Sequence, residues 1–274
     1  MDSLEQSRRF SDVVNYIDVK RTEMCESVGL FETLKDESLP KRQRMLFAPY
    51  MLFFSVGSPD IKTLMMRIEK PQEELSLAER KINAFINEDN FHYNFYLRDL
   101  ERLGYGLDRF GSISAVVRHV FAEEGIPTRR LVYGIGSYID QESDPLIGLA
   151  ITEIIEAGLF DLFTTVYQHI IKADADETYA DFDYFGDTHV MLERNHTVTS
   201  WFAPGHPEDE EVADQAVSPE TFVKIVEMVD DLMGRFAEMY RAFDEIVRSN
   251  RDIRPAKFTV EGSPPIDRVT HGHA

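Results

Sequence analysis

The stretch Asp187-Thr-His-Val-Met-Leu-Glu-Arg-Asn-His196 decides how the rest of the chain is interpreted. Within it, His189, Glu193 and His196 are spaced four and then three residues apart. At about 100° per residue, an α-helix places three such side chains within roughly 60° of one another. Two imidazoles and a carboxylate on one stripe suit Fe, Mn or Zn, but the same stripe on a surface helix would be only a solvated polar face. Matching donors on other helices would favour the metal site.

The hydrophobic pattern of the chain is helical nearly throughout, and the regular alternation typical of strands is absent. We therefore expect an all-α protein. Capping or proline signals mark the starts of three long helices, at Ser76-Leu-Ala-Glu79, Asp144-Pro145 and Ser218-Pro219. We expect these helices to end near residues 103, 171 and 247, respectively.

Glycine and proline suggest the other boundaries. The pattern predicts a first helix over residues 4–34 with a break at Gly29. It also predicts an apolar helix over 41–56 that ends at Gly57-Ser58-Pro59, and a shorter helix over 60–69. Residues 201–216 are predicted to form a loop, because they contain two prolines, a glycine and an acidic run.

The chain has 274 residues, enough for one large domain or two small ones, and no linker divides it. We expect a single helical domain over residues 1–250. Residues 251–274 are rich in proline, glycine and charge, which is typical of a tail without a core of its own.

The formal net charge is −20, which argues against nucleic acid and against anionic membranes as partners, because phosphate groups bind to basic surfaces. No apolar run is long enough to span a bilayer. Cys25 is the only cysteine, which leaves no disulfide framework and no thiolate metal site. Together with a polar N-terminal segment, these features predict a cytoplasmic monomer or homodimer.

Two further groups of polar residues accompany the His189 stretch. His92 follows Asp89 by three residues and Glu88 by four, so both carboxylates share nearly one side of a helix with it. Glu153 and Glu156 lie on a stripe that is otherwise apolar. Acidic side chains on such a stripe have to be paired, protonated or bound to a cation, since unpaired burial costs several kcal/mol.

Each group also has a purely structural explanation. His92 would then be a core histidine bonded to Asp89 or Asp99, and the acids of the Asp144 helix would pair with Arg98 or Arg118. The sequence leaves both explanations open.

The pairs Asp89-x-x-His92 and Glu193-x-x-His196, with a lone Glu between them, are similar to the ligand pattern of di-iron helix bundles. The additional His189 makes the chain resemble the haem-oxygenase-like di-iron oxidases, a branch of the fold that also contains TenA-like and pyrroloquinoline-quinone-synthase-like proteins. The order of the motifs agrees: His92 lies 64 residues before Glu156, which lies 33 residues before His189.

This resemblance implies a single seven-helix haem-oxygenase-like bundle. It implies an oxidase or oxygenase that holds two Fe(II) ions and uses O2 on a small organic substrate, such as a fatty acid, an amino acid or an amine. The implied metal ligands are Asp89, His92, Glu153 or Glu156 (with Glu156 preferred), His189, Glu193 and His196.

The chain departs from the family pattern at one ligand. Many members have an acid seven residues before the first histidine, where this chain has Phe85, so the acid three residues before it, Asp89, is expected to serve. Glu88 and Asp99 are its substitutes. The alternatives in function are a metal-free TenA-like or cofactorless-oxidase-like enzyme of the same fold, and a non-enzymatic acidic helical interaction protein.

Overall fold

A computed structural model describes residues 8–172, 181–193 and 207–253, and these residues are predominantly helical. The longer helices are α1 (Phe10–Glu26), α4 (Leu52–Ile61), α5 (Leu77–Asp89), α6 (His92–Arg102), α9 (Ile126–Gln141), α10 (Pro145–Val166) and α14 (Pro219–Arg248). The shorter ones are α2 (Leu30–Lys35), α3 (Lys41–Arg44), α7 (Leu107–Phe110), α8 (Ile113–Val120), α11 (Asp187–Glu193) and α13 (Pro207–Ala213).

Tighter or wider turns join or extend several of these helices. The 3-10 turns are η1 (Ala48–Met51), η3 (Gln72–Glu74) and η4 (Glu123–Gly125). Two π-helical segments continue longer helices: η2 (Lys62–Met66) follows α4, and η5 (Tyr167–Ile171) follows α10. The short strands β1 (Arg8–Arg9) and β2 (Ala216–Val217) form one antiparallel pair, which the sequence pattern did not predict.

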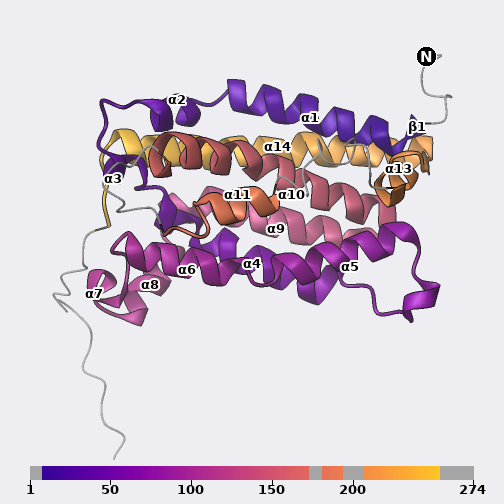
Figure 1. Cartoon of the computed structure of the whole chain (residues 1–274), viewed down its shortest axis with the longest axis horizontal. Coiled ribbons are helices and arrows are strands. Elements are labelled where there is room, and N and C mark those ends of the chain that lie inside the picture. Colours follow the sequence, from indigo (N-terminus) through magenta and orange to yellow (C-terminus); the bar gives the residue numbers. More distant parts are fainter. Residues whose placement is uncertain (1–7, 173–180, 194–206, 254–274) are drawn as a thin grey trace, which may run out of the picture.

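The long helices run along one common axis and form an all-α bundle (Figure 1). Helices α1 and α14 lie along one side, while α4, α5 and α6 lie along the other. Helix α10 contacts both groups, since it packs on α1 and α14 as well as on α5, and α11 lies against it. Two glutamates of α10, Glu153 and Glu156, are buried among these helices.

Close packing around α10 depends on Gly158. A Cβ atom at this position would come within 2.5 Å of the Phe236 ring on α14. The hydroxyl group of Tyr240, one turn further along α14, donates a hydrogen bond to the Gly158 carbonyl oxygen. The small side chains that follow Glu156 thus leave room for a neighbouring helix.

The predicted starts of three helices are confirmed. Ser76 and Glu79 form a reciprocal capping box, in which the Ser76 N–H donates to Glu79 Oε2 at 2.7 Å. The Asp144 side chain caps α10 through the Leu146 N–H at 2.9 Å, and Ser218 caps α14 through the Thr221 N–H at 3.0 Å. The break at Gly29, between α1 and α2, is also as predicted.

Several predicted helix boundaries are wrong. The helix expected over residues 41–56 is divided into α3, η1 and α4, and no separate helix begins at residue 60. Helix α4 continues through Gly57 and Pro59 instead of ending there, because it is packed along α9 and stabilised by that contact. The single helix expected from Ser76 to Leu103 is interrupted at residues 90–91, so that α5 ends at Asp89 and α6 begins at His92.

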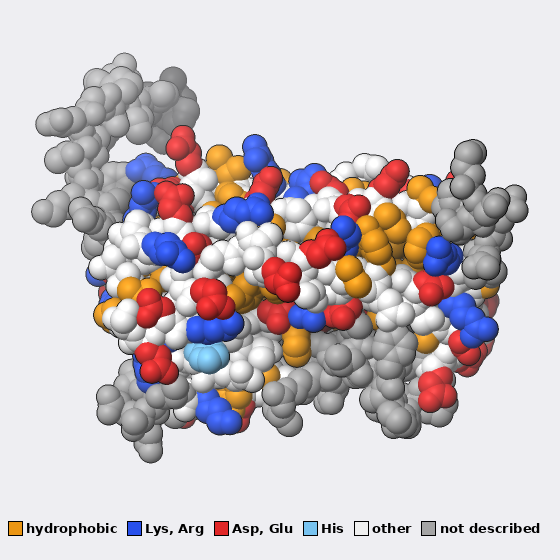
Figure 2. Space-filling model, turned by 90° about the horizontal axis from the view of Figure 1, so that it is seen from above, with side chains coloured by type: hydrophobic (Ala, Val, Ile, Leu, Met, Phe, Trp, Pro, Cys, Tyr) orange, Lys and Arg blue, Asp and Glu red, His pale blue; other side chains and the backbone are white. Residues whose placement is uncertain are grey.

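Another correction concerns the predicted loop over residues 201–216. Its described part contains α13, which starts at Pro207, a residue that fits the first turn of a helix. The expected tail over 251–274 lies outside the described residues apart from its first three. In the described ranges, no helix has both the length and the apolar composition needed to cross a membrane. On the face seen from above, basic and acidic side chains are interspersed (Figure 2).

Candidate functional site

A small cavity lies inside the bundle where α4, the junction of α5 with α6, α10 and α11 meet. Its volume is about 20 Å³, which suits one water molecule or one ion and is too small for an organic substrate. Its polar lining comes from Ser55, Ser58, Lys62, Asp89, His92, Glu156, Tyr184 and His189. Residues far apart in the sequence, including four of the predicted ligands, thus share one cavity.

The interruption between α5 and α6 positions the first pair of predicted ligands. Asp89 is the last residue of α5 and His92 is the first of α6, and the Oδ1 of Asp89 lies 3.0 Å from the Nδ1 of His92. The His92 side chain is buried and stacks on Phe95, with the ring centroids 6.0 Å apart. The purely structural explanation of His92, a core histidine bonded to Asp89, therefore has its geometry in the fold.

His189 approaches His92 from α11. The Nε2 of His189 lies 3.3 Å from the Nδ1 of His92, and only 2% of His189 is exposed. Tyr184 stacks on the His189 ring, with the centroids 4.6 Å apart and the planes 25° apart. Phe163 of α10 meets the same ring edge-on at 4.5 Å. These two aromatic contacts restrict the orientation of the imidazole.

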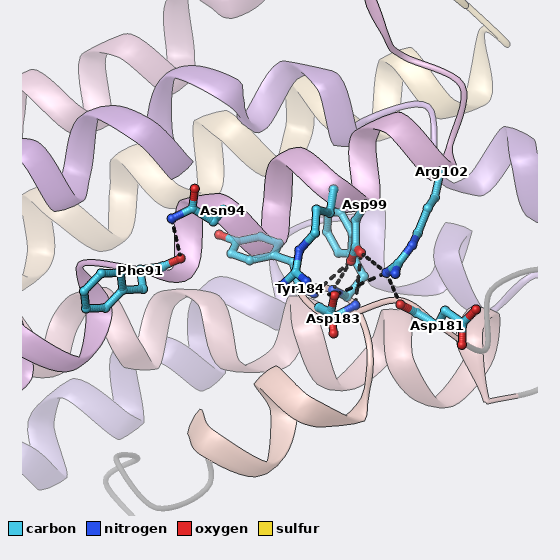
Figure 3. Close-up of polar contacts among 9 residues, drawn as sticks. Phe91, Asn94, Asp99, Arg102, Asp181, Asp183 and Tyr184 are labelled. Carbon is cyan, nitrogen blue, oxygen red and sulfur yellow. Dashed lines mark hydrogen bonds and ion pairs between the residues drawn. The ribbon is translucent and has the colours of Figure 1, made fainter.

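Asp99 holds the turn that leads into α11. Its carboxylate accepts hydrogen bonds from the main-chain N–H groups of Asp183, Tyr184 and Phe185 at 3.0, 2.8 and 2.9 Å (Figure 3). Burial raises the pKa of Asp99, and these three donors and Arg102 oppose that shift. The carboxylate is thus an anchor for the backbone and does not line the cavity, which corrects its place as a substitute ligand.

Gly186 ends the same turn. A Cβ atom there would lie 1.7 Å from the Phe182 carbonyl oxygen, a contact that no side chain tolerates. Only glycine therefore fits at this position, three residues before His189, without moving the start of α11 at Asp187.

The sequence did not predict Lys62, the first residue of η2. Lys62 is 2% exposed, and its ammonium group forms an ion pair with the Oδ2 of Asp89 and lies 4.4 Å from the centre of the Phe85 ring. Burial alone would raise the pKa of Asp89, but the charge of Lys62 and the contact with His92 outweigh it and lower that pKa well below its ordinary value. The site already contains a cation.

The alternative carboxylate ligands differ in their position relative to the cavity. Glu156 lines the cavity, whereas Glu153, one turn earlier on α10, is buried but does not line it. Glu88 is exposed. Glu193 is the last residue of α11, and its side chain is outside what the structure describes, as is all of His196.

Arg98, one of the predicted partners for the buried glutamates, instead lies 3.4 Å from the Asp183 carboxylate. This contact adds to the polar network around the turn before α11. It also leaves Arg98 half-exposed at the surface, away from the cavity lining.

Imidazole and carboxylate groups are donor types that bind metal ions. Around one ion with bonds of about 2.0–2.2 Å, neighbouring donor atoms lie about 3 Å apart. The spacings from His92 Nδ1 to Asp89 Oδ1 and to His189 Nε2, 3.0 and 3.3 Å, match this value.

The hydroxyl group of Ser58 supports the same interpretation. It lines the cavity, is 1% exposed, and has no hydrogen-bond partner among the described residues. A ligand held in the cavity would satisfy it. Within those same residues, however, no group of three or more His, Cys, Asp or Glu side chains is arranged so that it could hold a metal ion. The described donors are of types that bind metal ions, and the predicted ligand set extends beyond them to Glu193 and His196.

No protein-family model and no curated protein matches this sequence significantly. The fold and the site define the chain as an all-α bundle with a buried centre of histidines, carboxylates and one lysine.

Sequence reasoning missed Lys62 and Tyr184. A signal for Lys62 is present, since it is the only charged residue in the apolar segment Ile61-Lys-Thr-Leu-Met-Met66. No comparable signal marks Tyr184, because its position depends on the turn that Asp99 anchors.

Proposed function

We propose that this protein is a non-haem iron enzyme that activates O2 toward a small organic substrate. Asp89, His92, Glu156 and His189 would hold the iron from the described part of the chain. Glu193 and His196 would add to this set, as the sequence pattern predicts.

The observation that carries the proposal is the convergence of Asp89 Oδ1, His92 Nδ1 and His189 Nε2 at a buried cavity. Buried histidines and carboxylates from three separate helical segments are costly to assemble unless a cation or a proton network compensates them. Imidazole and carboxylate donors together suit iron. The resemblance in motif order points to the same metal.

The residues around the donors have separate roles in this proposal. Tyr184 and Phe163 restrict the rotation of the His189 ring, and Asp99 fixes the turn that carries Tyr184. The apolar side chains of Phe54, Ile155 and Leu159 line the same cavity and exclude bulk water. When bound, Fe(II) would supply the electrons that O2 requires.

The small volume of the cavity limits the size of the ligand that its lining residues could bind. About 20 Å³ accommodates an ion or a small ligand, so an organic substrate would have to bind next to this centre and not inside it. A small molecule remains the proposed substrate class, because the net charge of −20 disfavours nucleic acid. The protein is proposed to act in the cytoplasm as a monomer or homodimer.

The Lys62–Asp89 ion pair favours a second candidate. Because the ammonium group already neutralises Asp89, the centre would be electrostatically tolerable without metal. This would suit a metal-free TenA-like or cofactorless-oxidase-like enzyme. A non-enzymatic interaction protein is the third reading, and the buried polar centre does not favour it.

Anaerobic loading with Fe(II), removal of excess metal and measurement of iron per chain test the proposal. We expect iron to bind to the native protein and to a His119→Gln control, whose substitution is remote from the cavity lining. The variants His189→Ala and His92→Gln should lose it. Addition of O2 to the loaded native protein should then change its optical spectrum.

A native protein that stays free of iron while its helical circular dichroism is intact would overturn the proposal. If that metal-free protein consumed O2 with an organic substrate, the cofactorless enzyme would be the better account.

A further inference from the structure

In the segment around Lys62, the charged side chain is buried and large apolar side chains are exposed, the reverse of the usual arrangement. Leu64 and Met65 are 75% and 45% exposed, yet Lys62 is only 2% exposed. Lysine is almost never buried without a partner, and exposing two large apolar side chains while burying a charge is unfavourable. Such a local conflict between sequence and structure is typical of a functional position.

The backbone explains how the reversal arises. Pro59 lies inside α4, and the helix widens into the π-helical segment η2 at Lys62. A π turn shifts the side chains that follow it around the helix axis, and such turns are frequent at functional sites. The result directs Lys62 toward α5, where its Nζ meets the face of Phe85 and the carboxylate of Asp89.

The two oxygen atoms of Asp89 face different groups. Oδ1 lies 3.0 Å from His92 Nδ1, beside His189, whereas Oδ2 is paired with the Lys62 ammonium group. A carboxylate can bridge two cations by giving one oxygen to each. Here, the Lys62 ammonium group is the cation at Oδ2.

We propose that Lys62 replaces the second metal ion, so that the centre binds one ion, at Asp89 Oδ1, His92 and His189. This inference rests on the proposed function, and it sets the metal content at one ion in place of the two that the sequence resemblance implies. A second divalent ion at Oδ2 would have to approach the ammonium group in a buried setting, where like charges repel strongly. The aromatic face of Phe85 favours the ammonium group at this place.

Mn(II) titration under anaerobic conditions tests this inference, because Mn(II) takes the same oxygen and nitrogen donors and has an electron paramagnetic resonance spectrum. The native protein and a Lys70→Met control should bind one Mn(II) with the spectrum of an isolated ion. Lys70 is a suitable control because its ion pair with Glu79 lies outside the cavity. Lys62→Met should bind two, with the spectrum of a coupled pair.

The metal-free proteins provide a second readout. Removing the ammonium group leaves the Asp89 carboxylate without its cation, so metal-free Lys62→Met should melt several degrees below the native protein and regain this loss on addition of Mn(II). If Lys62→Met does not fold, Lys62→Gln, which keeps a neutral donor for Asp89, should show the same gain of a second ion.

Two ions in the native protein, or one ion in both the native protein and a folded Lys62 variant, would overturn the inference while the proposed function stands. Absence of Mn(II) and Fe(II) from the native protein and from every variant would instead overturn the proposed function.

Discussion

The Nε2 of His189 lies 3.3 Å from the Nδ1 of His92, although the two residues are 97 positions apart in the chain. This contact joins the junction between α5 and α6 to α11, and it depends on how the turn before α11 is held. Substitution of each residue that holds this turn or lines the cavity is expected to have a separate, measurable effect.

Asp99→Asn should weaken both the fold and the site. Asparagine keeps one acceptor oxygen but loses the charge that three main-chain N–H groups share, so the free energy of unfolding should fall by about 1–3 kcal/mol. Iron affinity should fall at least tenfold, because Tyr184 and His189 lose their support. Asp187→Asn, at an exposed position at the start of α11, is the control and should change neither quantity. Denaturant unfolding and iron titration measure both effects, and normal iron affinity in a destabilised Asp99→Asn protein would refute the proposed anchoring role.

Gly186→Ala should be strongly destabilising. The new methyl group would overlap the Phe182 carbonyl oxygen, so the turn has to open, at a cost of at least about 2 kcal/mol. Gly234→Ala provides a control of opposite sign, since it lies within α14 with open space around it and should stabilise the protein by about 0.5–1 kcal/mol. Equal melting temperatures for the two variants would show that the turn is not constrained as described.

The two buried glutamates of α10 should respond differently to substitution. Glu156→Gln should lower iron content, because Glu156 lines the cavity, whereas Glu153→Gln should leave it unchanged. Both variants remove one charge from the same helix and differ by one turn, which makes them a matched pair. Metal analysis after anaerobic loading is the measurement, and loss of iron only in Glu153→Gln would reverse the assignment.

His119 should make the stability of the protein depend on pH near neutrality. Burial lowers the pKa of His119 below its ordinary value, against an opposing hydrogen bond with the Pro49 carbonyl group. The unfolded chain therefore takes up a proton at higher pH than the folded protein, and stability falls as the pH drops through the unfolded pKa of about 6.5.

In His119→Gln, the decrease in unfolding free energy between pH 7.5 and pH 5.5 should be smaller than in the native protein. Chemical denaturation at several pH values measures this difference, and an identical slope in the two proteins would show that His119 makes no such contribution.

Local signals predicted the parts of the fold that local chemistry controls. The Ser76–Glu79 capping box and the caps at Asp144 and Ser218 are formed by residues within three positions of each other, so the sequence was sufficient to find them. The passage of α4 through Pro59 was not predictable in this way, because the packing of α4 on α9 decides it.

The candidate site also combines residues that local sequence signals predict with residues that they do not. Helical spacing in the sequence predicted that Asp89, His92, Glu156 and His189 face the interior. All four line one cavity in the structure. Lys62 escaped prediction because a π-helical turn sets its direction, and the sequence pattern assumes a regular α-helix. The role of Asp89, His92, Glu156 and His189 as metal ligands remains a prediction.

Anomalous diffraction at the iron absorption edge, from crystals grown anaerobically with Fe(II), tests the central claim most directly. The account predicts one strong peak in the cavity, within bonding distance of His92 Nδ1 and His189 Nε2, with Lys62 still paired to Asp89. A cavity without an anomalous peak, in crystals of protein whose iron lies elsewhere or is absent, would contradict it.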